Sequence, residues 1–122
     1  MKLIKLIGSK TEEDIRNQLL RSHKSLFQDE GRKRILSIVR TYFPEMKTAY
    51  IIAWTPDQGE DIITFLINNN IIADIEIDRI DTKIEPIIES KLLNNNYIKG
   101  LRKIPQITLA IAIELANRDL ES

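Results

Sequence analysis

The chain of 122 residues has no cysteine, a single histidine and only four glycines. Without cysteine it cannot form disulfides, thiolate zinc sites or a cysteine nucleophile. The four glycines form no glycine-rich phosphate-binding loop. No apolar run approaches the ~20 residues that a membrane-spanning helix requires. We therefore expect neither thiol redox chemistry nor a membrane-spanning role.

Hydrophobic residues make up 43% of the chain and charged residues 30%, a balance typical of a soluble folded protein. A chain of this length can bury a core without disulfides or metal ions. We predict a single domain over residues 1–122. The opening sequence MKLIKLIG is interrupted by lysine, and no small-residue cleavage site follows it. We therefore read no signal peptide and expect a cytoplasmic protein.

The net charge is zero, but the charges are unevenly distributed along the chain. Residues 1–47 contain eleven Lys or Arg and six Asp or Glu, whereas residues 48–89 contain two basic and nine acidic residues. We expect this asymmetry to give the folded protein two faces of opposite potential. Such a field acts on the choice of partner and the rate of association more than on the fold.

The first third of the chain carries the features of a helical hairpin. A first helix can begin with either of two capping pairs, Ser9 with Glu12 or Thr11 with Asp14. A second helix, over about residues 32–43, has apolar residues at i, i+3, i+4 and i+7 and a basic opposite side. We expect the two helices to pack together on a sheet.

The only histidine, His23, falls on the apolar side of the first predicted helix, beside Leu19, Leu26 and Phe27. No Ser/His/Asp order surrounds it. We therefore expect a core or boundary histidine rather than a catalytic one.

Residues 48–81 read as three strands joined by two turns. Ala49–Trp54 is apolar without a break, which is typical of a central strand covered on both faces. The PDQG and NNN segments supply the residues that tight turns favour. The predicted strands are Ala49–Trp54, Asp61–Ile67 and Ile71–Arg79.

The third predicted strand alternates between apolar and acidic residues. Its odd-numbered apolar residues point into the core, whereas Asp74, Glu76 and Asp78 point into solvent. Ile72 is the one exception on the polar side. The three carboxylates form a stripe about 13 Å long at ~3.3 Å per residue. Because like charges repel, the stripe is either solvated or kept for a positively charged partner.

Two helices are predicted after the strands. Pro86 suits the first position of one helix, which would run to the break at Asn94–Asn96, and Pro105 can open the other. A strand is the competing prediction for Ile107–Ile113, although its alanines favour a helix.

These elements together predict an α+β fold. A three-stranded antiparallel β-meander packs against helices supplied by both ends of the chain. The divisions are an N-terminal helical hairpin at 1–47, the meander at 48–81 and C-terminal helices at 82–122.

Two hypotheses assign a metal ion to the acidic residues. Same-face residues on one strand lie about 7 Å apart, so the stripe would bind a metal only with oxygens from a second strand or loop. Pro56-Asp57 followed by Asp81-Thr82-Lys83 is similar to the PD-(D/E)xK arrangement of Mg²⁺-dependent nucleases. In that arrangement the acid-x-lysine element ends a strand beside the first acid, whereas Asp57 falls in a predicted turn. We predict no metal and no cofactor.

Four basic residues of the second helix are candidates for contact with nucleic-acid phosphates. Exposed charges on one helix are commonly solvated, and a net charge of zero is unlike that of a dedicated nucleic-acid-binding protein. Direct nucleic-acid binding is therefore an alternative and not the main prediction. The four residues are Arg32, Lys33, Arg34 and Arg40.

The stretch TPDQGEDIITFLINNNIIADIEIDR is a strand pair after a PDQGED turn in a short cysteine-free chain. It resembles the small bacterial immunity proteins of contact-dependent growth inhibition and related polymorphic toxin systems. The resemblance implies a cytoplasmic, non-enzymatic protein that neutralises the toxin domain of a sister effector, commonly a nuclease or tRNase. Carboxylates suit that role, because a nuclease is basic where it binds its substrate.

We therefore predict an immunity protein that binds a basic nuclease toxin domain. A metal-dependent nuclease or a nucleic-acid-binding protein is the alternative. The predicted partner-binding residues are six carboxylates and one apolar anchor: Asp57, Glu60, Asp61, Asp74, Glu76, Asp78 and Trp54.

Overall fold

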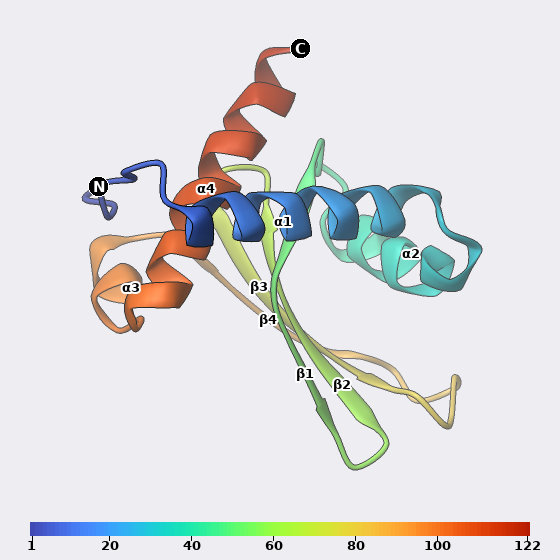
Figure 1. Ribbon diagram of the computed structural model, residues 1–122. Coiled ribbons are helices and arrows are strands. Elements are labelled where there is room, and N and C mark those ends of the chain that lie inside the picture. The colour runs from blue at the N-terminus through green and yellow to red at the C-terminus, as the bar shows by residue number, and fades with distance from the viewer.

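A computed structural model describes all 122 residues, and its elements come in three blocks of helices, strands and helices (Figure 1). The α+β class and the N-terminal helical pair are confirmed. The first helices are α1 (Lys10–Gln28), the 3-10 helix η1 (Glu30–Arg32) and α2 (Lys33–Tyr42). The strands are β1 (Ala49–Asp57), β2 (Glu60–Ile67), β3 (Ile71–Asp78) and β4 (Ile87–Leu92). The last helices are α3 (Asn95–Lys99) and α4 (Lys103–Glu121).

The sheet has four strands rather than the predicted three. Its order is β1-β2-β3-β4, and every neighbouring pair is antiparallel. The predicted helix after Pro86 is wrong, because Ile87–Leu92 pairs with β3 and sets Ile88 opposite Ile75. Pro86 lies just before the paired residues, where its missing N–H costs no ladder bond. The paired segment is 6 residues long, a length typical of a strand and too short for most helices.

β1 is an edge strand and not the central strand that its apolar sequence predicts. α1 crosses the inner part of this strand (Figure 1). The Ala49 carbonyl oxygen lies 2.9 Å from His23 Nδ1 of α1. A bulge at Ile52 shifts the pairing register between Ile51 and Ala53. Helices therefore bury Ala49 and Tyr50 and partly cover Ile51, Ile52 and Trp54 on a strand that has only one sheet neighbour.

The two faces of the sheet bury separate hydrophobic clusters. α2 covers one face, which we call the α2 face, where Phe65 and Ile75 are inaccessible to solvent. α4 covers the inner half of the other, the α4 face, over Tyr50 and Ile72. This second cluster explains why Ile72 breaks the alternation of its strand. It is a core residue on the side where the outer positions are acidic.

α1 crosses the inner end of the sheet at β1 and contacts both clusters (Figure 1). Leu19, in its first half, packs in the cluster of α4, and Leu26, near its end, packs in the cluster of α2. Arg16 Nη2 also lies 2.6 Å from Glu114 Oε2 of α4. One helix therefore joins the two layers that the sheet separates.

α1 begins with the first of its two candidate capping pairs. Ser9 Oγ accepts a hydrogen bond from the Glu12 N–H at 3.2 Å. The Glu12 carboxylate in turn accepts bonds from the backbone N–H groups of Ile7 and Gly8 at 2.9 to 3.1 Å. These bonds, led by the one from Ile7, hold the pKa of Glu12 below its ordinary value. Glu12 is buried, so the cap is an internal part of the fold.

A polar network fastens α4 to β1. Asp119 Oδ2 accepts hydrogen bonds from Thr48 Oγ1 at 2.7 Å and from the Tyr50 hydroxyl at 2.6 Å. Burial, together with the hydrogen bond to Asp119 and its charge, raises the pKa of Tyr50. The ring of His23 stacks on Tyr50 with centroids 4.4 Å apart. His23 is half-buried in this packing, which confirms the predicted boundary position.

The C-terminal part confirms one helix and corrects the position of another. α4 contains Ile107–Ile113 as helix, not strand, and most of this segment is buried. α3 begins inside the asparagine segment predicted as a break, because Asn94 Oδ1 accepts a bond from the Tyr97 N–H at 2.9 Å. No helix combines the length and the apolar character that crossing a bilayer requires.

The outer half of the sheet extends beyond the helices (Figure 1). The turn between β1 and β2 lies at this end and uses Gly59 at a φ of 82°. The turn between β2 and β3 lies at the opposite end and uses Asn68 at a φ of 53°. Glycine and asparagine are the residues that adopt positive φ most readily. Both predicted turns are therefore confirmed. The turn at Gly59 closes the end of the sheet that extends beyond the helices, and the turn at Asn68 closes the end that the helices cover.

Candidate functional site

The outer half of the α4 face has no helix over it, and we call this surface the open face (Figure 1). Strand pairing brings carboxylates from all four strands together on it, with Asp57 opposite Glu60 and Asp74 opposite Glu89. Asp78 lies opposite Glu60 on the next strand. The six carboxylates of the open face are Asp57, Glu60, Asp74, Glu76, Asp78 and Glu89.

None of these six carboxylates forms an ion pair with a basic residue of the chain. Lys91 is the only basic strand residue on this side of the sheet, opposite Ile72. Its ammonium lies over the Tyr97 ring, 5.1 Å from the centroid. The negative charge of the open face is therefore uncompensated by ion pairing within the chain.

Two glutamates of the open face interact directly with each other. A hydrogen bond with the Glu76 carboxyl, and the charge of that group, raise the pKa of Glu60 above its ordinary value of 4.5. The charges of Asp78 and Asp57 act in the same direction. The strands therefore hold these carboxylates closer together than they would lie in free solution.

Asp78 has a structural task in addition to its charge. Its Oδ1 accepts hydrogen bonds from the backbone N–H groups of Ile80 and Asp81, both at 2.8 Å. These bonds, led by that from Asp81, lower the pKa of Asp78, and the charge of Arg34 adds to the effect. Asp78 thus orders the segment that leaves β3, which limits the freedom of its side chain to meet a partner.

Asp74 is fixed by its cross-strand neighbour. Thr64 Oγ1 donates a hydrogen bond to Asp74 Oδ1 at 2.6 Å. Burial raises the pKa of Tyr97, and the charge of Asp74 adds to the effect. The carboxylate therefore keeps one defined orientation at the boundary between the open face and α3.

Two predicted partner-binding residues lie on the other side of the sheet. Asp61 is on the α2 face, opposite Ile77, and its Oδ1 lies 3.6 Å from Arg79 Nε. Trp54 is half-buried on the same face, with the Arg32 guanidinium 4.5 Å from its ring centroid. Strand alternation therefore places both side chains on the α2 face, away from the six carboxylates of the open face.

The apolar residues of the open face are two isoleucines that flank Glu76. Ile62 and Ile87 lie opposite Glu76 on its two neighbouring strands. Ile87 is 60% exposed, and Ile62 belongs to neither hydrophobic cluster. An apolar centre within a polar surround is typical of a protein-binding surface. Ile62 and Ile87 are therefore the large apolar side chains on the open face, whereas Trp54 lies on the α2 face.

Ile87 and Glu89 were missed by the sequence prediction because both lie on β4. The assignment of a helix after Pro86 placed them outside the sheet. The short length of the segment between Pro86 and the asparagine turn was the signal that favoured a strand.

The basic residues of α2 have partners within the chain, although Lys33 and Arg40 remain exposed. Arg34 Nη1 donates to the Asp78 carbonyl at 2.9 Å, and Lys33 Nζ lies 3.0 Å from Glu30 Oε2. Arg32 is stacked on Trp54, and the Arg40 guanidinium lies 5.9 Å from the Phe27 ring centroid. Each of the four predicted phosphate-binding residues has a partner within the chain, so the structure gives nucleic-acid binding no support.

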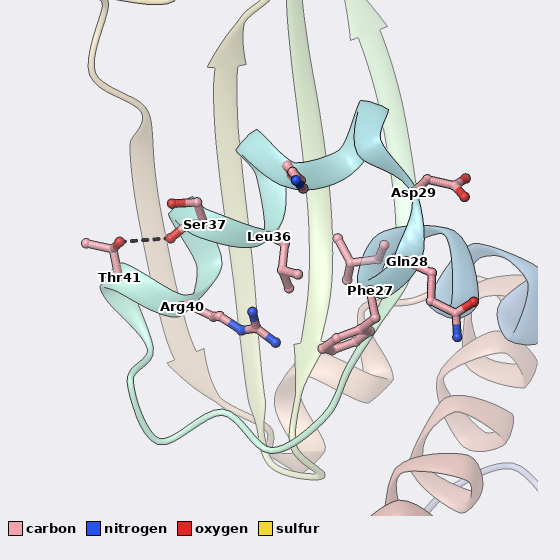
Figure 2. Close-up of a pocket in the computed structure, with 9 residues that line it drawn as sticks. Phe27, Gln28, Asp29, Leu36, Ser37, Arg40 and Thr41 are labelled. Atoms are coloured by element: carbon pink, nitrogen blue, oxygen red, sulfur yellow. Dashed lines mark hydrogen bonds between the residues drawn. The ribbon is translucent and has the colours of Figure 1, made fainter.

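The largest surface groove, of about 590 Å³, lies between the end of α1 and α2 (Figure 2). Its apolar part is formed by Leu26, Phe27 and Leu36, and Arg40 extends toward the Phe27 ring (Figure 2). Thr41 bonds back to the Ser37 carbonyl of its own helix at 2.8 Å. The groove contains no group of acidic or histidine ligands and lies on the side opposite the open face. It is not the surface that the charge pattern indicates.

The metal hypotheses depend on carboxylates being brought together. Nowhere in the chain do three or more Asp, Glu or His side chains form a group that could hold a metal ion. The Asp57 side chain bonds to the Gln58 N–H at 2.9 Å, and that of Asp81 to the Lys83 N–H at 2.9 Å. Both acids of the proposed nuclease motif therefore order their own turns, and the geometry gives that motif no support.

Comparison of the chain with protein-family models, with curated proteins and with solved structures gives no match.

Proposed function

We propose that this chain is an immunity protein that binds a basic toxin domain, such as a nuclease or tRNase, through its open face. The observation that carries the proposal is the set of carboxylates that have no ion pair in their own chain. The raised pKa of Glu60 reflects the repulsion that the fold tolerates there. A positively charged partner would relieve this repulsion and gain electrostatic steering during association.

The geometry divides the open face into a central contact and a charged surround. Ile62 and Ile87 would contact apolar groups of the toxin, while Asp74, Glu76 and Glu89 would meet Lys or Arg side chains. Asp78 would contribute mainly by ordering the segment after β3. No residue of the open face needs a chemical step in this role, because inhibition follows from occupying the toxin surface.

The test requires a secreted effector encoded beside this gene, whose C-terminal domain would be expressed as the toxin. Coexpression of this chain should prevent its toxicity, and the purified pair should associate. The triple variant Asp74→Asn/Glu76→Gln/Glu89→Gln should slow association by about tenfold or more and flatten its salt dependence. The matched control Glu13→Gln/Asp14→Asn/Glu85→Gln removes three exposed carboxylates elsewhere and should leave most of the rate intact.

Two results would contradict the proposal. Equal association rates for the triple variant and its control would remove the open face from the interface. Mg²⁺-dependent cleavage of nucleic acid by this chain, lost in Asp57→Ala and Lys83→Ala, would instead establish the nuclease alternative.

A further inference from the structure

The two edges of the sheet differ in how they are protected from further pairing. α1 covers the inner part of the β1 edge, and the strand carries a bulge at Ile52 and a proline, Pro56, near its outer end. These features hinder the addition of another strand. β4 forms the other edge, and β3 is the element packed along it. Its pairing with β3 runs without a bulge from Ile87 to Leu92, and it contains no proline. The β4 edge therefore presents a regular row of backbone groups.

The pairing with β3 determines which backbone groups of β4 are free. The Leu93 N–H donates to the Asn70 carbonyl at 2.8 Å, in the same register that sets Leu92 opposite Ile71. Backbone N–H and C=O groups alternate between the two sides of a strand. The odd-numbered residues therefore bond toward β3. Residues 88, 90 and 92 direct their groups outward.

The side chains of β4 are complementary to a reversed copy of the same strand. Glu89 and Lys91 lie on the same face, with Ser90 between them. Like charges at these two positions would protect the edge against pairing with a second copy. Here the charges are opposite, and they lie symmetrically about Ser90. Leu92, on the other face, is 67% exposed.

We propose that two copies of this chain form a symmetric dimer by antiparallel pairing of their β4 strands about Ser90. Ser90 would pair with Ser90 of the second copy, and Ile88 with its Leu92, through the outward backbone groups. Glu89 would then lie opposite Lys91 of the second copy at a non-hydrogen-bonded position, where Cα atoms are only ~4.5 Å apart. Centring the pair on Glu89 or Lys91 instead would set like charges opposite. Backbone alternation and charge thus agree on one register.

The dimer would join the two sheets into one. Antiparallel strands within one sheet are related by an axis perpendicular to it, so both open faces would lie on the same side. This arrangement does not depend on the proposed toxin, and the toxin proposal does not require a dimer.

The first experiment measures the mass of the full chain in solution by light scattering as its concentration is raised. The wild type should approach twice the monomer mass. Lys91→Glu should remain monomeric, because four carboxylates would meet at the seam. The swap Glu89→Lys/Lys91→Glu should restore the dimer, and Lys99→Glu, an exposed charge change on α3, should leave it unchanged. A wild type that stays monomeric, or a swap that fails to restore a folded dimer, would overturn the proposal.

The second experiment tests the register directly. The chain has no cysteine, so Ser90→Cys introduces a single thiol at the predicted axis. Hydrogen-bonded antiparallel pairs have Cα atoms ~5.5 Å apart, within the range that a disulfide spans. Mild oxidation should link Ser90→Cys into dimers much faster than Glu85→Cys, whose position lies outside the pairing. Equal rates for the two variants would rule out the Ser90-centred register.

Discussion

Ile62 and Ile63 are neighbours on β2, yet they belong to different kinds of surface. Ile63 points to the α2 face and is 0% exposed, whereas Ile62 points to the open face and joins no hydrophobic cluster. The same alternation places Asp61 in an ion pair with Arg79 on one side and Glu60 among uncompensated carboxylates on the other. One side of the outer sheet is therefore held by packing and ion pairing, whereas the carboxylates on the other side have no ion pair within the chain.

The largest expected difference between the two faces is in stability. Ile63→Ala should lower the free energy of unfolding by about 2–5 kcal/mol, because it removes a fully buried side chain and leaves a cavity. Ile62→Ala makes the same chemical change one residue away and should cost under ~1.5 kcal/mol. Urea unfolding of both variants measures the contrast. Similar losses would show that the open face is packed as tightly as the α2 face.

A second, smaller effect is expected at the covered, inner end of the α4 face. Asp119→Ala should cost about 1–3 kcal/mol, because the buried Tyr50 hydroxyl loses its acceptor. Adding Tyr50→Phe should recover part of that loss, since an apolar ring no longer needs an acceptor. Thermal unfolding of the single and double variants measures the coupling free energy between Asp119 and Tyr50. A double variant with fully additive losses would contradict the role given to this bond.

A third prediction uses pH to distinguish the buried carboxylate of Glu12 from the carboxylates of the open face. The pKa of Glu12 is lowered by folding, so its contribution is complete above the ordinary value of 4.5 and is lost as pH falls through the lowered value. Glu12→Gln should therefore destabilise the protein at neutral pH and reduce its loss of stability in acid. Glu13→Gln, on the same helical turn but exposed, should change neither. Unfolding midpoints measured from pH 7 to pH 3 provide the comparison.

The smallest expected effect has the opposite sign. The pKa of Glu60 is raised by folding, so the repulsion it feels appears as pH rises from 4.5 through the raised value. Glu60→Gln should slightly increase stability at pH 7 and have little effect below pH 4.5. The same unfolding series detects this difference. A loss of stability at pH 7 would mean that the Glu60 carboxylate is held by favourable contacts and is not in surplus.

Local patterns predicted the parts of the fold that depend on neighbouring residues. The Ser9–Glu12 cap, the turns at Gly59 and Asn68, and the alternation of β3 all follow from short stretches of sequence. In each case the bond or side-chain direction is determined within a few residues. The stripe on β3 was predictable for the same reason.

The parts that could not be predicted depend on distant pairing. β2 reads DIITFLI, with apolar residues on both faces, so its sequence does not reveal that Asp61 faces α2. The apolar run Ala49–Trp54 lies on an edge strand because α1 and α4 pack against this part of β1, and the sequence alone cannot distinguish cover by helices from pairing with a second strand. β4 was recognisable by length alone, since its pairing with β3 is what makes it a strand.

The position of α1 also determines when the protein can finish folding during synthesis. Arg16 and Glu114, whose side chains meet, are separated by 98 residues of sequence. The helix made first therefore has half of its packing partners only after α4 has been made. Until then the ribosome carries a nascent chain whose β-meander can form locally, while Leu19 and its neighbours remain unburied and within reach of chaperones.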